Sequence, residues 1–160
     1  MDGWVMKPFD TYPNDRMIVL PKMTGANCRH EYGLKLQQLT KQNNCAYCGV
    51  DLTSDYYKWL LLSVDHVIPV SECKRLGIKG IWAQSYSNVV LCCLGCNSFN
   101  NRYQIQKYQR SPEWTLQAFF NLRDEVFIER KKVIDNKRVT EMEFFSGRPW
   151  EQLPRRSDEL

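Results

Sequence analysis

Four cysteines in the chain have the spacing of metal ligands. Cys45 and Cys48 are separated by two residues, and so are Cys93 and Cys96. Each pair can present two thiolates from one tight turn, and four thiolates complete a tetrahedral zinc site with no open position for a substrate. We therefore expect these cysteines to hold a structural Zn²⁺ ion. The alternatives are iron on the same thiolates and a set of unrelated buried cysteines.

The other three cysteines fall outside this pattern. Cys92 is next to Cys93, but only Cys93 has the two-residue spacing to Cys96, so Cys92 is expected in the core. Cys28 and Cys73 have no cysteine partner at ligand spacing and are interpreted as packing residues, with a second, unrelated site at Cys28-x-His30 as the alternative. An odd total of seven cysteines, in a chain that does not open on a secretory signal, favours metal or catalytic use over a disulfide framework.

An aspartate and a histidine lie side by side between the two cysteine pairs, at Asp65 and His66. A carboxylate is a hard oxygen ligand for Mg²⁺ or Mn²⁺, and a neutral imidazole with an ordinary pKa of about 6.5 can take a proton from water. Phosphodiester hydrolysis needs both a metal and a base. Asn97 and Asn101 are four residues apart and would supply further oxygen ligands from one helix face. The alternative for an asparagine at a helix start is a plain N-cap.

Periodicity predicts the elements that must position these residues. We expect a helix over 30–42, a strand over 59–68, a long loop over 70–87, a second strand over 89–91, a short helix over 96–103 and a longer helix from 113 to about 134. The Asp65–His66 pair would lie near the end of the first strand, because Pro69 limits its continuation. Trp82 and Tyr86 in the loop are expected to pack, with contact to nucleic acid as the alternative.

In this order the motifs resemble those of the HNH, or ββα-metal (His-Me finger), endonuclease family. The resemblance extends over about residues 30–104 and rests on Cys45-x2-Cys48, Asp65-His66-x2-Pro69, Asn88-x4-Cys93 and Cys96-Asn97. It implies an α+β fold in which a two-stranded hairpin and a helix surround a catalytic divalent metal. A zinc knuckle would clamp the base of this hairpin, and further helices would flank it.

The resemblance also implies roles for the residues that match. His66 corresponds to the general base, and Asp65 and Asn97 correspond to ligands of the catalytic Mg²⁺ or Mn²⁺. Asn101 falls where some members have a third ligand. Asn88 corresponds to an asparagine that braces the loop by hydrogen bonds to the backbone, which is structural support.

One feature departs from the pattern. Many relatives carry a lysine near the position of Asn100, whereas the nearest cation here is Arg102, which we expect to bind phosphate. The implied activity is hydrolysis of DNA phosphodiester bonds, with double-stranded DNA as the default partner.

Two alternatives come from other functional classes. A non-catalytic, zinc-stabilised nucleic-acid-binding module would keep the four cysteines but would not need Asp65 and His66. A redox or iron-binding protein would use the cysteines for electron transfer, and it would leave His66 and the asparagines without a role.

Length and charge limit the number of domains and the classes of partner that the chain can have. The chain has 160 residues, enough for one domain, and a formal net charge of +4, which permits nucleic-acid binding without establishing it. We expect an irregular N-terminal arm over 1–29, the nuclease core over 30–104, a helical extension over 105–138 and a loosely ordered tail over 139–160. No run of about 20 apolar residues is present, so we expect a cytoplasmic protein without membrane contact.

Overall fold

The computed structural model describes residues 8–19 and 28–152. These residues form a mixed α and β structure around one small antiparallel sheet, in agreement with the expected α+β class. The strands are β1 (Leu62–His66) and β2 (Val89–Cys93), and the α-helices are α1 (Gly33–Thr40), α2 (Tyr56–Leu60), α3 (Val70–Leu76), α4 (Gly80–Ala83), α5 (Leu94–Phe99) and α6 (Leu116–Ser146). A π-helical turn covers Cys28–Tyr32, and 3-10 turns cover Pro8–Thr11, Tyr86–Asn88 and Pro149–Glu151.

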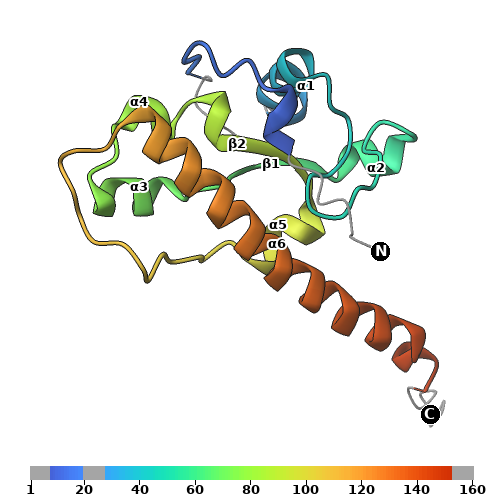
Figure 1. Ribbon diagram of the computed structural model, residues 1–160. Coiled ribbons are helices and arrows are strands. Elements are labelled where there is room, and N and C mark those ends of the chain that lie inside the picture. The colour runs from blue at the N-terminus through green and yellow to red at the C-terminus, as the bar shows by residue number, and fades with distance from the viewer. Residues whose placement is uncertain (1–7, 20–27, 153–160) are drawn as a thin grey trace, which may run out of the picture.

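The two strands pair antiparallel, with Leu62 opposite Cys93 and His66 opposite Val89. Most of their residues are buried, because helices and the N-terminal segment cover both faces of the sheet. Helix α5 begins directly after β2, while α3, α4 and a 3-10 turn lie between the two strands in the chain (Figure 1). Asp65 and His66 occupy the last two positions of β1, where the sequence placed them.

Helix α6 provides the long wall of the core. Thr115 caps its N-terminus by accepting a hydrogen bond from the backbone N of Ala118, at 3.1 Å. Figure 1 shows the helix lying diagonally past the hairpin, with its C-terminal half extending beyond the other elements. Its buried residues recur every three or four positions as an amphipathic helix requires: Phe119, Leu122, Arg123, Val126, Phe127, Arg130 and Ile134.

The prediction of a loosely ordered tail from residue 139 was wrong for 139–146, which continue α6 as far as Ser146. The buried stripe ends at Ile134, and this marked the predicted end of the helix. Strong helix formers such as Glu141, Met142 and Glu143 follow, and they extend a helix without needing a core contact. Residues 153–160 of the expected tail lie outside the described residues.

Two further predictions about the elements needed correction. Trp59 and Leu60 belong to α2, not to a strand, because Asp55 caps a helical turn by accepting from the backbone N of Lys58 at 2.9 Å. The expected loop over 70–87 is mostly helical, since it contains α3, α4 and a 3-10 turn. Short apolar runs do not separate strand from helix by periodicity alone, which explains both errors.

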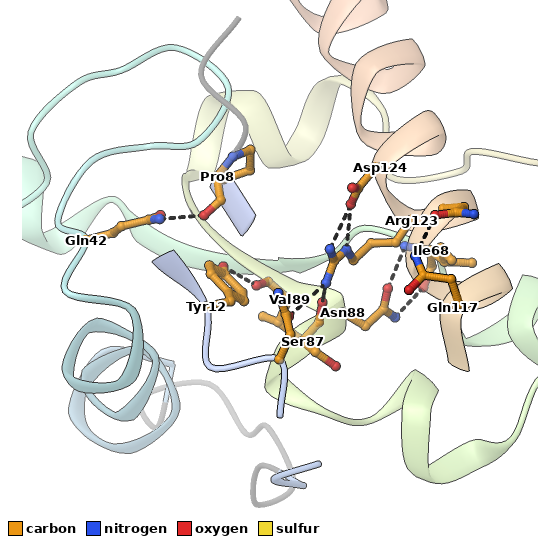
Figure 2. Close-up of polar contacts among 12 residues, drawn as sticks. Pro8, Tyr12, Gln42, Ile68, Ser87, Asn88, Val89, Gln117, Arg123 and Asp124 are labelled. Atoms are coloured by element: carbon orange, nitrogen blue, oxygen red, sulfur yellow. Dashed lines mark hydrogen bonds and ion pairs between the residues drawn. The ribbon is translucent and has the colours of Figure 1, made fainter. Parts of the chain in front are cut away.

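The N-terminal arm is part of the core over its described residues. Phe9 and Tyr12 are buried, and the Tyr12 hydroxyl donates to the carbonyl O of Val89 at 2.6 Å (Figure 2). Val19 forms an isolated bridge with Ser85. Over the described ranges, the structure contains no helix of the length and apolarity that a membrane crossing needs.

Candidate functional site

The four cysteines singled out from the sequence come together. Their sulfur atoms all lie within 4.8 Å of one another, and Sγ of Cys48 is 3.9 Å from Sγ of Cys93. Four thiolates around zinc, each about 2.3 Å from the ion, would stand about 3.8 Å apart in a tetrahedron. The cluster can therefore hold a metal ion such as zinc. Cys92, Cys28 and Cys73 are not part of it.

Backbone contacts place the two cysteine pairs. The turn that carries Cys45 and Cys48 attaches to β2 through a hydrogen bond from the N of Ala46 to the O of Leu91, at 2.9 Å. Gly49 closes this turn at a φ of 77°, a conformation that favours glycine. Cys93 ends β2, and its sulfur accepts from the backbone N of Cys96 at 3.4 Å, as the cap of α5.

Thiols this close share protons unequally. Hydrogen bonding with Cys45 lowers the pKa of Cys93 to about 6 and takes the pKa of Cys48 far below its ordinary value. Hydrogen bonds within the cluster raise the pKa of Cys45, chiefly through Cys48, and of Cys96, chiefly through Cys45. Four thiolates at this spacing need a cation between them, because like charges at contact distance oppose ionisation.

Asp65 faces the side of the sheet that carries α5 and α6. Its Oδ2 accepts a hydrogen bond from the Tyr47 hydroxyl at 2.6 Å and forms an ion pair with Nη2 of Arg130 at 2.9 Å. The side chain is only 11% exposed. Neither contact uses Oδ1, which has no hydrogen-bond partner in the part of the chain that the structure describes.

Asn97 lies on α5 beside the same face of β1. Its Nδ2 donates to Oγ of Ser63 at 3.0 Å, and Ser63 is two residues before Asp65, so both strand side chains point to one face. Among residues 8–19 and 28–152, no donor contacts Oδ1 of Asn97. The Oδ1 atoms of Asp65 and Asn97 are thus a carboxylate and an amide oxygen, the ligand types that a hard divalent cation prefers.

His66 points to the opposite face of the strand, since neighbouring strand residues alternate. Its Nε2 is buried and has no hydrogen-bond partner among the described residues. Burial lowers the pKa of the imidazole, and this outweighs the opposing effect of the nearby Asp65 carboxylate. An imidazole whose pKa lies below 6.5 is mostly neutral at pH 7, the form that can accept a proton.

Asn88 is fully buried just before β2 and bonds to backbone on two segments. Its Oδ1 accepts from the N of Ile68 at 3.0 Å, and its Nδ2 donates to the O of Ile68 at 2.9 Å and to the O of Ala83 at 3.0 Å. Figure 2 shows this pairing between Asn88 and Ile68. The contacts fix the chain directly after the Asp65–His66 pair.

Asn101 and Arg102 lie beyond α5, in an exposed turn. Helix α5 ends at Phe99, so the expected helix over 96–103 is shorter than predicted. The four-residue helical spacing that would bring Asn101 to the same ligand position as Asn97 is therefore lost. Arg102 forms none of the salt bridges found within the described ranges and keeps its guanidinium at the surface.

Sequence reasoning missed two residues that contact Asp65, namely Tyr47 and Arg130. Arg130 is buried on α6 and reaches the end of β1, while Arg123, seven residues earlier, donates to the O of Ser87 at 3.0 Å (Figure 2). Arginine is seldom buried without a partner. Two arginines within the apolar stripe of a helix, two turns apart, were a readable sign of buried polar partners.

Comparison of the chain with protein-family models, with curated proteins and with solved structures gave no match. The class of protein is thus given by the fold and the site alone: an α+β protein with a four-cysteine cluster able to bind a metal ion.

Proposed function

We propose that this protein is an HNH-type endonuclease that hydrolyses DNA phosphodiester bonds with the help of a divalent metal. The observation that carries the proposal is that Asp65 and His66 are the last two residues of β1, while Asn97 of α5 is bonded to Ser63 on the face of Asp65. The metal ligands and the base would therefore meet around the end of the strand. The four-cysteine cluster lies at the other end, where Cys93 is paired with Leu62.

His66 is the proposed general base. Its buried Nε2 lacks a protein partner over the described ranges, and a buried polar atom without a partner is rare unless a ligand or water meets it. In the reaction His66 takes a proton from the attacking water, and the oxygen then attacks phosphorus in line with the leaving 3′ oxygen.

Asp65 and Asn97 are the proposed ligands of the catalytic Mg²⁺ or Mn²⁺, each through its uncontacted Oδ1. A divalent cation bound there would stabilise negative charge on the scissile phosphate and on the leaving oxygen. Tyr47 and Arg130 hold Oδ2 of Asp65, which leaves Oδ1 as the ligand atom. Arg102 is the proposed phosphate contact. Asn101 is no longer proposed as a ligand, because it lies beyond the end of α5.

Zinc at the four cysteines has a structural role in this proposal. The cluster joins the Cys45–Cys48 turn to the junction of β2 and α5, so it fixes the element that carries Asn97. Structural zinc in small domains binds with about 10 to 16 kcal/mol of apparent free energy, comparable to the whole stability of a domain.

One observation favours the alternative of a non-catalytic, zinc-stabilised nucleic-acid-binding module. Asp65 already has a cationic partner in Arg130, so its charge has a structural use without a metal. The two functions predict different results when binding and cleavage of one labelled DNA duplex are measured together.

The zinc-loaded protein is incubated with the duplex in Mn²⁺, in Mg²⁺ and in chelator mild enough to spare the zinc. The nuclease proposal predicts cleavage that requires the divalent ion and is lost in Asn97→Ala, with duplex binding retained. Asn101→Ala is the matched control and is expected to cleave like wild type. Binding without cleavage under every condition would support the binding module.

A further inference from the structure

All three nitrogens of the Arg130 guanidinium have partners within the protein. Nη1 donates to the carbonyl O of His66 and to that of Val67, both at 2.8 Å. Nη2 contacts Oδ2 of Asp65 at 2.9 Å and the O of Asn100 at 2.9 Å, and Nε donates to Oδ1 of Asn100 at 3.2 Å. The guanidinium thus makes four hydrogen bonds and one ion pair within the protein.

The burial of Arg130 limits what this side chain can bind. The side chain is 1% exposed, and the ring centroids of Tyr47 and Tyr103 are 6.0 and 5.8 Å from its Cζ. A cation this buried, with every nitrogen already paired within the protein, is not accessible to the phosphate of a nucleic acid. Its partners instead belong to two places, the end of β1 and the residue that follows α5.

We propose that Arg130 is a positioning residue, which holds Asp65 and the end of α5 in fixed relative positions for the catalytic metal. This proposal rests on the proposed nuclease function. Arg130 fixes Asp65 through the carboxylate and the following two residues through their carbonyls, while both bonds to Asn100 fix the last turn of α5. Asn97 lies in that turn. The two proposed metal ligands thus come from two elements that one side chain joins.

Lysine cannot take over this role. It keeps the positive charge but has three donors on one nitrogen, without the planar fork that reaches partners on two elements. Arg130→Lys therefore changes the geometry while it keeps the charge near Asp65. Loss of an outer partner of a metal ligand lowers metal affinity about 10- to 100-fold.

The chain supplies a matched control in Arg123. It is also buried on α6, donates to the O of Ser87 and pairs with Asp124, and its Cζ lies 3.7 Å from the Phe9 ring centroid. It makes no hydrogen bond or ion pair with Asp65, Asn97 or Asn100 within the described residues. Arg123→Lys removes a buried guanidinium of α6 but leaves the proposed tie intact.

Two measurements on the zinc-loaded full chain test the proposal. The first is Mn²⁺ binding followed by electron paramagnetic resonance, which needs no activity. We expect Arg130→Lys to weaken Mn²⁺ binding about tenfold, and Arg123→Lys to keep it within twofold of wild type. The second is hydrogen exchange of the segments 62–68 and 94–101, which should become faster in Arg130→Lys and not in Arg123→Lys.

Asn100→Ala replaces Arg130→Lys if that variant does not fold, because it removes only the bond from Nε. Unchanged or tighter Mn²⁺ binding in these variants would overturn the positioning role, and so would unchanged exchange. If wild type itself binds no Mn²⁺ but exchange responds as expected, the metal-dependent function fails while the tie between the two elements stands.

Discussion

Asn88 lies directly before β2, and its side chain is hydrogen-bonded both to the segment after β1 and to α4. Within the described residues no other side chain makes this connection, and replacing Asn88 with alanine removes it. The amide makes three hydrogen bonds to backbone, two with Ile68 and one with Ala83, and it is fully buried. Alanine would leave one donor and two acceptors without that partner, in a region that water does not reach.

The expected cost follows from those three groups. A buried donor or acceptor left without a partner costs about 1 to 3 kcal/mol, and local rearrangement recovers part of the sum. We therefore expect Asn88→Ala to lose about 3 to 5 kcal/mol of unfolding free energy. For a chain of 160 residues, each kcal/mol shifts the melting temperature by about 2 to 4 °C, so the shift should be near 10 °C.

Thermal unfolding by circular dichroism, with zinc content verified, measures this shift. Asn101→Ala is the matched control, since Asn101 is exposed in the turn after α5, and its melting temperature should change by less than about 2 °C. A shift below about 3 °C for Asn88→Ala would refute the reasoning, because that corresponds to about one net hydrogen bond.

Zinc removal and acid provide two further tests. Cys96→Ser should lose the metal and cooperative melting together, as judged by metal analysis and circular dichroism, because one ligand of four is gone; retained cooperative melting without metal would contradict this. Buried Glu72 is bonded to Arg75, which holds the pKa of this carboxyl below its ordinary value of 4.5, and it also accepts from the N of Ile105 at 2.9 Å. A carboxyl whose pKa is lower in the folded state stabilises the fold at pH values above its unfolded-state pKa. This stabilisation is lost as the pH falls through the folded-state pKa. The melting temperature of wild type should therefore fall more steeply below pH 4.5 than that of Glu72→Gln, and parallel curves would argue against it.

The approximate positions of the two strands and the cysteine cluster could be predicted from the sequence, because local signals specify them. The two-residue spacing of Cys45–Cys48 and Cys93–Cys96 requires only tight turns, and the apolar runs before His66 and after Asn88 mark the hairpin. Helix α6 was located by its apolar stripe. Its end was missed, because the stripe stops at Ile134 while helix propensity continues.

The surroundings of Asp65 could not be predicted, since they depend on contacts between distant parts of the chain. Tyr47 and Arg130 are 18 and 65 residues away from it in sequence, and the residues around them do not identify Asp65 as the partner. The end of α5 at Phe99 is a tertiary effect as well, because both the carbonyl and the side chain of Asn100 bond to Arg130. Local propensity does not contain these contacts.

Cleavage of supercoiled plasmid by the zinc-loaded protein in Mg²⁺ or Mn²⁺, with His66→Ala beside it, tests the central claim most directly. His30→Ala is the matched control, because His30 is the other histidine of the chain, is exposed and contacts the Trp59 ring edge-on. The nuclease account predicts cleavage by wild type and His30→Ala, and a loss of about 100-fold or more in zinc-replete His66→Ala. Cleavage by His66→Ala at the wild-type rate would contradict the account, as would no cleavage by wild type with either metal.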